Sequence, residues 1–313
     1  MMNELSFKPL AITALTVFSL NAATAFAADP PTGVQDAIPV AKALSGTKKD
    51  DGWYNLSSSS KTKIVDGASI TISGNTGYPS GFGFPPSTSA WTNPIASQVN
   101  SGGVKANFNK VGNNAENTFG PYPATDGLYA LSFTNVANAK GGTLGVFEAN
   151  PVADLANVVF QVEIGGANGY DFYRPGTPAG TVASGTPQIG ALTNIDYSPK
   201  LNLTFAGGAT TTLTAGWAEL SAQGENGTTT IPGGGTEAIY VNLYAFQWDL
   251  SSYNNISSFN ITFDVVEHSQ TYAARLTQSD VFNQVVAVPE PESYAMLLAG
   301  LGLIGFAARR RQA

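Results

Sequence analysis

The sequence contains no cysteine and a single histidine among its 313 residues. The absence of cysteine excludes disulfides, thiolate metal sites and cysteine nucleophiles, and one histidine excludes the zinc motifs that need two. A serine–histidine–aspartate triad would have to use His268, yet no Gly-x-Ser-x-Gly turn is present to display the serine. We therefore interpret His268 as a structural residue held by hydrogen bonds at a strand end, and we expect a protein that is not an enzyme.

Charged residues are also scarce, at 12% of the chain, and the acidic ones are in excess. Between residues 28 and 291, 11 of the 15 Lys and Arg and 20 of the 22 Asp and Glu remain, which gives a net charge of −9. The basic residues are scattered along the sequence, whereas nucleic acids and anionic lipids require clustered positive charge. We therefore expect no nucleic acid partner.

No window between the two ends shows a long helical period, and short alternating stretches take its place. Apolar and polar residues alternate over Leu201–Phe205, Phe259–Val265 and Asn157–Ile164, which is the pattern of strands with one buried face. Ile239–Phe246 is apolar on both faces and predicts a central strand. Weaker strand patterns cover Ser69–Ser73, Leu128–Phe133, Gly142–Phe147 and Tyr272–Thr277.

Glycine-rich turns separate these stretches. Gly207 and Gly208 can adopt the positive φ angles of a tight turn, so we expect a hairpin from about Lys200 to Trp217. Many short strands joined by such turns favour an all-β fold, an antiparallel, jelly-roll-like β-sandwich.

The predicted sandwich covers residues 44–287 and follows a linker at residues 28–43. Residues 51–123 are less regular than the rest. They nevertheless include Trp53 and Trp91, whose large apolar rings need a place to bury. We therefore interpret this segment as an insertion in the same sandwich rather than as a flexible arm.

Aromatic residues offer one candidate binding surface. Tyr240 and Tyr244 share a face of the predicted central strand, which leads into Trp248, and Trp217 stands at the end of the predicted hairpin. Exposed aromatic rings are a common platform for sugars in β-sandwiches. The alternative is that these four residues belong to the core.

Carboxylates offer two further alternatives. A pair of them could hydrolyse glycosides, although the sequence does not tell which two converge. Oxygen ligands in sandwich loops would also suit a structural calcium ion, although no Asp-x-Asp-x-Asp-Gly loop is present; beyond that ion we expect no cofactor. The candidates are Glu163, Asp171, Glu219, Glu237, Asp249, Asp264 and Glu267.

The beginning of the chain has the parts of a secretory signal peptide. A lead that carries Lys8 precedes an apolar run from Leu10 to Phe26. The run ends in an Ala-x-Ala site formed by Ala25 and Ala27. We expect residues 1–27 to form a signal helix that signal peptidase removes after Ala27, with Ala25 and Ala28 as the alternative cleavage positions.

The other end combines three features within residues 288–313. Val288–Pro291 reads Val-Pro-Glu-Pro, Tyr294–Ala308 carries no charge, and Arg309, Arg310 and Arg311 follow. As a helix, the apolar run would be about 22 Å long, short of a hydrocarbon core of about 30 Å. The arginines should stay on the cytoplasmic side, so the proline motif would face outward during a transient insertion in the inner membrane.

This tail resembles the PEP-CTERM sorting signal, a motif followed by a short transmembrane helix and an arginine cluster. The resemblance implies that an exosortase, a membrane transpeptidase, recognises Pro289, Glu290 and Pro291 and cuts near them. It also implies a Gram-negative bacterium that makes exopolysaccharide and forms biofilms. Glu292 departs mildly from the Ser or Thr that is common after the second proline.

Three hypotheses for the body follow. The first is an exported surface or extracellular-matrix protein with a structural or adhesive role linked to exopolysaccharide or biofilm. The second is a carbohydrate-binding module that holds exopolysaccharide or cell-surface glycans, and the third is a secreted glycosidase.

Overall fold

The chain folds into strands joined by turns and loops. The computed structural model describes residues 44–65, 68–75, 94–100, 103–112, 121–124, 126–130, 138–166, 170–178, 180–181, 190–192, 197, 199–231 and 235–284. These residues contain strands and no helix, and accordingly none of their elements is a helix able to cross a bilayer. The predicted signal helix, linker and C-terminal helix lie outside the described residues.

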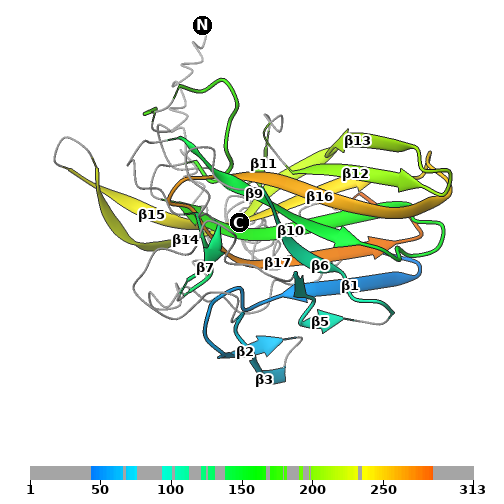
Figure 1. The fold of residues 1–313 in the computed structure, drawn as a ribbon, viewed down its shortest axis with the longest axis horizontal. Coiled ribbons are helices and arrows are strands. Elements are labelled where there is room, and N and C mark those ends of the chain that lie inside the picture. Colours follow the sequence, from blue (N-terminus) through cyan, green and yellow to red (C-terminus); the bar gives the residue numbers. More distant parts are fainter. Residues whose placement is uncertain are drawn as a thin grey trace, which may run out of the picture.

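Two antiparallel sheets form the body, together with a small hairpin (Figure 1). The nine-stranded sheet has the order β11 (Gly190–Ala191), β14 (Trp217–Ile231), β15 (Gly235–Asp249), β10 (Asn157–Gly166), β17 (Gln270–Ser279), β1 (Lys48–Trp53), β5 (Val99–Asn100), with β8 (Leu128–Tyr129) beside β17 and β7 (Tyr122–Pro123) beside β8. The six-stranded sheet has the order β13 (Thr210–Thr214), β12 (Lys200–Phe205), β16 (Ile256–Val266), β9 (Lys140–Glu148), β6 (Asn107–Gly112), β4 (Ile95–Ala96). The hairpin is β2 (Lys61–Val65) with β3 (Ala68–Ile72).

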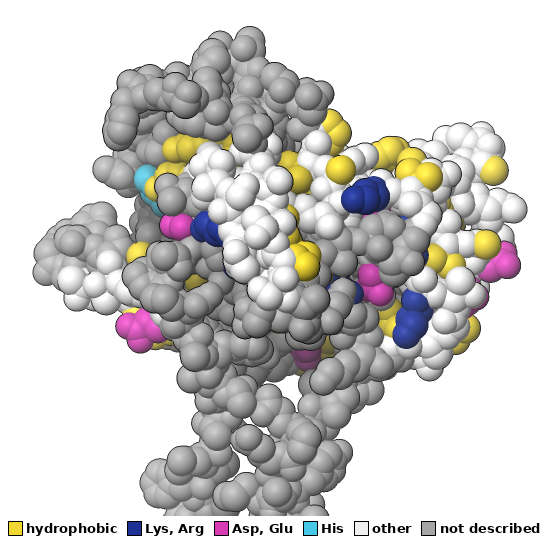
Figure 2. Space-filling model, turned by 90° about the horizontal axis from the view of Figure 1, so that it is seen from below, with side chains coloured by type: hydrophobic (Ala, Val, Ile, Leu, Met, Phe, Trp, Pro, Cys, Tyr) yellow, Lys and Arg dark blue, Asp and Glu magenta, His cyan; other side chains and the backbone are white. Residues whose placement is uncertain are grey.

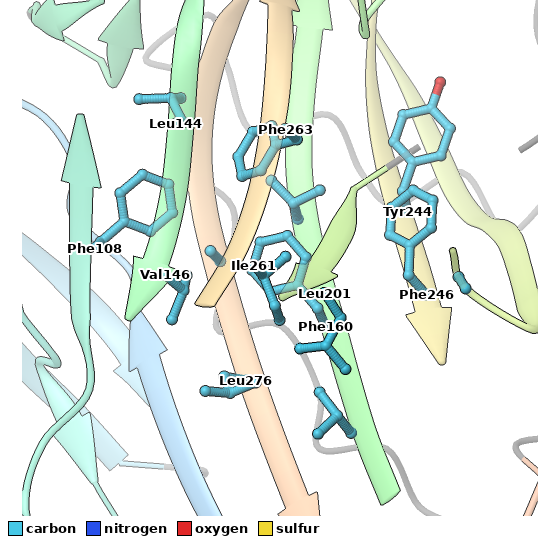
Figure 3. Packing of buried hydrophobic residues seen from close by; sticks show 14 of the residues in the cluster. Phe108, Leu144, Val146, Phe160, Leu201, Tyr244, Phe246, Ile261, Phe263 and Leu276 are labelled. Carbon is cyan, nitrogen blue, oxygen red and sulfur yellow. The ribbon is translucent and has the colours of Figure 1, made fainter. Parts of the chain in front are cut away.

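The two sheets enclose one apolar core, which makes the body a β-sandwich. Phe263 of β16 lies at its centre, with its ring centroid 5.7 Å from that of Phe160 in β10 and 6.3 Å from that of Phe108 in β6. Figure 3 shows the side chains of Phe108, Phe160 and Phe263 among the other labelled core residues, which include Ile261 and Leu276. The all-β, antiparallel prediction is confirmed, whereas the jelly-roll-like strand order stays a prediction.

The strands expected from alternation form where they were predicted. β12, β16 and β10 cover the three alternating stretches, and β15 is a central strand between β14 and β10. Four residues of β10 point into the core as expected: Val158, Phe160, Val162 and Ile164.

The predicted hairpin is confirmed in its turn and in its pairing of two strands, but it ends before Trp217. β12 pairs with β13 from Lys200 opposite Thr214 to Thr204 opposite Thr210, and Gly208 has a φ of 80° in the turn. β13 ends at Thr214, and Trp217 begins β14 in the nine-stranded sheet. Gly216 donates its backbone N–H to Gln247 of β15, so the chain has already crossed between sheets there.

The irregular segment at residues 51–123 contributes strands to both sheets. β1 and β5 extend the nine-stranded sheet, and β6 and β4 complete the six-stranded sheet. Trp53 is fully buried in the core, where its ring packs edge-on against Phe108. Trp91 lies outside the described residues.

The outer face of the nine-stranded sheet is covered. Every residue of β10 except Gly166 is buried, including the outward-facing Gln161 and Glu163. Part of the cover is a small apolar cluster, in which Ile72 of β3 packs with Tyr54 and with Ala273 of β17. Strands that are buried on both sides carry polar groups into the interior, and these groups need partners.

Candidate functional site

The signal-cleavage and sorting residues lie outside the described residues. They are Ala25 and Ala27 near the start, and Pro289, Glu290, Pro291 and Arg309–Arg311 at the end. Their roles therefore stand on the sequence and on the comparison with known families given below.

Two of the four candidate sugar-binding aromatics belong to the core. Trp248 is 1% exposed and its indole N–H donates to the carbonyl oxygen of Leu213 at 3.3 Å. Tyr244 is 6% exposed, and its ring lies against Phe246 and Phe172. Figure 3 shows Tyr244 and Phe246 side by side along β15. Rings packed in this way leave no free face on which a sugar can stack.

The other two aromatics are partly exposed but do not share a surface. Tyr240 lies on the same side of β15 as Tyr244. Trp217 is paired with Gln247, so it lies on the opposite side of the nine-stranded sheet from Trp248. The fold thus does not bring the four residues together, and sugar binding at Trp217 or Tyr240 stays a prediction.

Tyr244 instead belongs to a buried polar network around Asp171. Oδ2 of Asp171 accepts hydrogen bonds from the Tyr244 hydroxyl at 2.5 Å and from Asn242 Nδ2 at 2.6 Å. Gln223 Nε2 donates to Asn242 Oδ1 at 2.7 Å and extends the network to β14. Burial raises the pKa of Asp171 to about 6, although the two hydrogen bonds act in the opposite direction.

Two tyrosines flank Arg174, which follows Asp171 in the chain. The guanidinium carbon lies 4.4 Å from the ring centroid of Tyr170 and 4.0 Å from that of Tyr197. Cations placed over aromatic faces in this way contribute about 0.5–2 kcal/mol. Arg174 thus links its own loop, which contains Tyr170 and Asp171, to the segment that contains Tyr197.

His268 lies in the turn between β16 and β17, with a φ of 65°. Its Nδ1 is 2.8 Å from the hydroxyl oxygen of Tyr129 in β8. Burial lowers the pKa of His268, which favours the neutral ring. The hydrogen bond is the one expected of a structural histidine at a strand end.

The candidate carboxylates are dispersed and mostly buried. Glu163, Asp171, Glu219 and Glu267 are between 1% and 9% exposed. Asp264 forms an ion pair with Lys140 at 2.8 Å on the outer side of the six-stranded sheet, and Asp249 is exposed beside Ser251. In the part of the chain that the structure describes, no three acidic or histidine side chains are grouped to hold a metal ion, so a structural calcium stays a prediction.

A surface that the sequence reasoning did not single out is the outer face of the six-stranded sheet. Cross-strand pairing places one residue from each of five strands in a row. We call this row the Asn/Thr row; it consists of Thr212, Asn202, Asn260, Phe147 and Asn107. The alternation that revealed β12 and β16 also marked Asn202 and Asn260 as outward, and that signal could have found the row.

Comparison with known families identifies the tail. Residues 287–311 match the family described as the PEP-CTERM protein-sorting motif. Neither a curated protein nor a solved structure matches the chain. The family match thus covers the tail alone, and the body is assigned to no family.

Proposed function

We propose, from the PEP-CTERM motif that marks this chain as an exported exosortase substrate, that the body is a non-enzymatic surface or matrix protein. Its role would be structural or adhesive and linked to exopolysaccharide or biofilm. The sorting motif at residues 287–311 is the observation that carries the proposal. Export through the inner membrane to the cell surface follows from the same motif.

The physical character of the tail supports processing rather than permanent anchoring. An apolar run of about 22 Å spans a bilayer of about 30 Å only if the membrane thins or its flanks adapt. The arginine cluster holds the C-terminus in the cytoplasm, which leaves the Pro-Glu-Pro segment just outside the membrane. An extended segment in that position is accessible to a membrane-embedded transpeptidase.

The architecture of the body supports a structural role. Long antiparallel strands and a core that draws on both sheets give a rigid sandwich. On the surface shown in Figure 2, the Lys and Arg side chains of the described residues form separate spots instead of one basic patch. Such a surface suits an uncharged matrix better than a polyanion.

Mass spectrometry of the protein recovered from the outer surface tests the delivery. We expect termini near Ala28 and near Pro291, and we expect deletion of the exosortase gene to leave the tail attached. A matched variant, Glu290→Ala, should also retain the tail, whereas Glu292→Ala should be processed normally. Recovery from the outer surface of a peptide that still includes Arg309–Arg311 would contradict the proposal.

A deletion strain tests the role. We expect loss of the protein to reduce cell aggregation or the amount of polysaccharide retained by washed cells. Release of new reducing sugar ends by the purified protein would instead favour the glycosidase hypothesis. The Asn/Thr row is the observation that favours the carbohydrate-binding alternative.

A further inference from the structure

The Asn/Thr row crosses most of the six-stranded sheet. Thr212 of β13 is opposite Asn202 of β12, which is opposite Asn260 of β16. Asn260 is opposite Phe147 of β9, which is opposite Asn107 of β6. Neighbouring strands lie about 4.8 Å apart, so the five side chains form a line of about 20 Å.

This face is open to solvent. Phe147 is 40% exposed, and Val111 of β6, which lies against Gly145 two residues before Phe147 on β9, is 56% exposed. Thr212 is exposed, and the three asparagines of the row are partly exposed. The outer face of the six-stranded sheet therefore differs from the covered outer face of the nine-stranded sheet.

The polar side chains of the row are already oriented by one another. The Thr212 hydroxyl donates to Asn202 Oδ1 at 2.7 Å, and Asn202 Nδ2 donates to Asn260 Oδ1 at 2.7 Å. Asn260 takes part in this chain of bonds only as an acceptor, through Oδ1. Its Nδ2 group donates no hydrogen bond to another described residue. The amide next to the exposed Phe147 ring is thus held in place with its donors available, which lowers the entropic cost of binding a ligand.

The neighbouring rows contain little charge. The row on one side consists of Thr210, Thr204 and Ser258. The row on the other side consists of Thr214, Lys200, Thr262, Gly145 and Asn109. Lys200 is the only charged residue among them, and its Nζ donates to Thr214 at 3.0 Å. Farther along, Asp264 is neutralised by Lys140. A polyanion would require clustered cations, which these rows do not supply.

The chemistry also disfavours a protein partner. Stable protein interfaces have a well-packed apolar centre and bury about 800 Å² on each side. Here Phe147 and Val111 are the large apolar side chains exposed among threonines, serines and asparagines. An aromatic ring flanked by oriented amides and hydroxyls is instead suited to sugar rings, whose apolar faces stack while their hydroxyls form hydrogen bonds.

We propose that the outer face of the six-stranded sheet, centred on Asn202, Asn260 and Phe147, binds an extended, neutral polysaccharide. The chain would lie across the strands along the Asn/Thr row, with a sugar ring on Phe147 and hydroxyls on the neighbouring asparagines. This inference rests on the proposed role at the polysaccharide-bearing surface. It places the binding surface on the sheet opposite to the one that carries Trp217 and Tyr240.

Affinity electrophoresis tests the proposal. The full-length chain is purified in a detergent without a sugar headgroup and run in native gels that contain hydroxyethyl cellulose, dextran, galactomannan or the anionic alginate. We expect at least one neutral polysaccharide to retard the protein. Phe147→Ala and Asn260→Asp should each weaken that retardation about tenfold in apparent Kd, which corresponds to one stacking contact or one hydrogen bond.

Asn260→Asp changes the donor: the aspartate Oδ1 can still accept the hydrogen bond from Asn202, whereas the Nδ2 donor of Asn260 is replaced by a carboxylate oxygen. Asn254→Asp, in the loop after β15, adds the same charge away from the row and should bind normally. Trp217→Ala should also bind normally. Loss of binding in Trp217→Ala but not in Phe147→Ala would overturn the proposal, as would retardation by alginate alone or by no polysaccharide.

The two proposals can fail separately. If the sorting proposal is wrong, the mass spectrum of the wild-type protein shows unprocessed termini. If the binding proposal is wrong, correctly processed protein is still not retarded in the gels by a neutral polysaccharide. Circular dichroism and thermal unfolding of each variant show whether a loss of retardation comes from misfolding, and a Phe147→Leu variant that keeps the fold but loses the flat ring should reproduce the loss.

Discussion

β10 and β16 have similar sequences in pattern and opposite surroundings in the fold. Both alternate apolar and polar residues, and both direct their apolar residues into the same core. The polar residues of β10, Gln161 and Glu163, are 7% and 3% exposed, whereas Asn260 and Thr262 of β16 remain partly open to solvent. Alternation therefore identifies the core-facing side of a strand but does not tell whether its other side is covered.

The covered face has acquired features that the open face does not need. On the nine-stranded sheet, Arg275 is buried and its Nη1 donates to the Tyr54 hydroxyl at 2.8 Å, while its Nε lies 3.4 Å from Asp50 Oδ1. On the six-stranded sheet, the polar side chains form hydrogen bonds in the presence of water. The same kind of residue thus costs more to disturb on the first face than on the second.

Replacing one basic residue on each face, Arg275 or Lys200, gives the largest expected difference. Arg275→Met should lower the free energy of unfolding by about 3–5 kcal/mol, because it removes the guanidinium that forms an ion pair with the mostly buried carboxylate of Asp50. Lys200→Met on the open face should change it by less than about 0.5 kcal/mol. Urea unfolding followed by fluorescence measures both.

Similar losses in Arg275→Met and Lys200→Met would show that the two outer faces do not differ in this respect. A double variant, Arg275→Met with Asp50→Leu, provides a check on the mechanism. It also removes the carboxylate that Arg275→Met leaves without the guanidinium, and it should recover part of the lost stability.

The pH dependence of stability tests the buried carboxylate of Asp171. Its pKa is about 6 in the folded protein and 3.8 without burial, so the folded state binds more protons between these values. The contribution of Asp171 to stability is therefore fully present below pH 3.8 and lost as the pH rises to about 6. The difference of about two units corresponds to about 3 kcal/mol.

Asp171→Asn removes this titration while its amide oxygen can still accept hydrogen bonds. As the pH rises from 3.8 to 7, the free energy of unfolding of the variant minus that of the wild type should increase by about 3 kcal/mol. Chemical unfolding at several pH values in this window gives the difference directly. A difference that does not vary with pH would show that Asp171 titrates in the folded protein as it does in the unfolded chain.

The smallest expected effect comes from the open face itself. Asn202→Ala removes the bonds that Asn202 makes with Thr212 and Asn260, but water can replace them, so we expect a loss of about 1 kcal/mol or less. Thermal and urea unfolding measure it. A loss above about 2 kcal/mol would mean that the Asn/Thr row is a structural brace instead of an accessible surface.

Local patterns predicted much of the fold because strands and turns depend on nearby residues. The alternation around Leu203, Ile261 and Val162 located three strands, and the glycines at 207 and 208 located a hairpin turn. The hairpin end was wrong because nothing in the sequence before Trp217 marks the crossing from one sheet to the other. Which strands become neighbours depends on contacts distant in sequence, such as that of β1 with β17.

The candidate site was less predictable for a related reason. The shared face of Tyr240 and Tyr244 was visible in the sequence, but whether this face points into the core depends on the opposing sheet. Asp171 could be identified as a carboxylate but not as the acceptor for Tyr244, which is 73 positions away. The Asn/Thr row likewise exists only after five strands from distant parts of the chain are aligned.

The first and last strands of the described body also determine how it can carry load. β1 and β17 are antiparallel neighbours, with Lys48 opposite Ser279. Thr47 donates its backbone N–H to Asp280 at 2.7 Å and Ser279 donates its hydroxyl to the carbonyl oxygen of Ser45 at 2.9 Å, so the chain enters and leaves the sandwich at one end. A force that draws these two ends apart would open the bonds between β1 and β17 in succession, like a zipper. A force between one end and the open face of the six-stranded sheet would instead be spread over many strands at once.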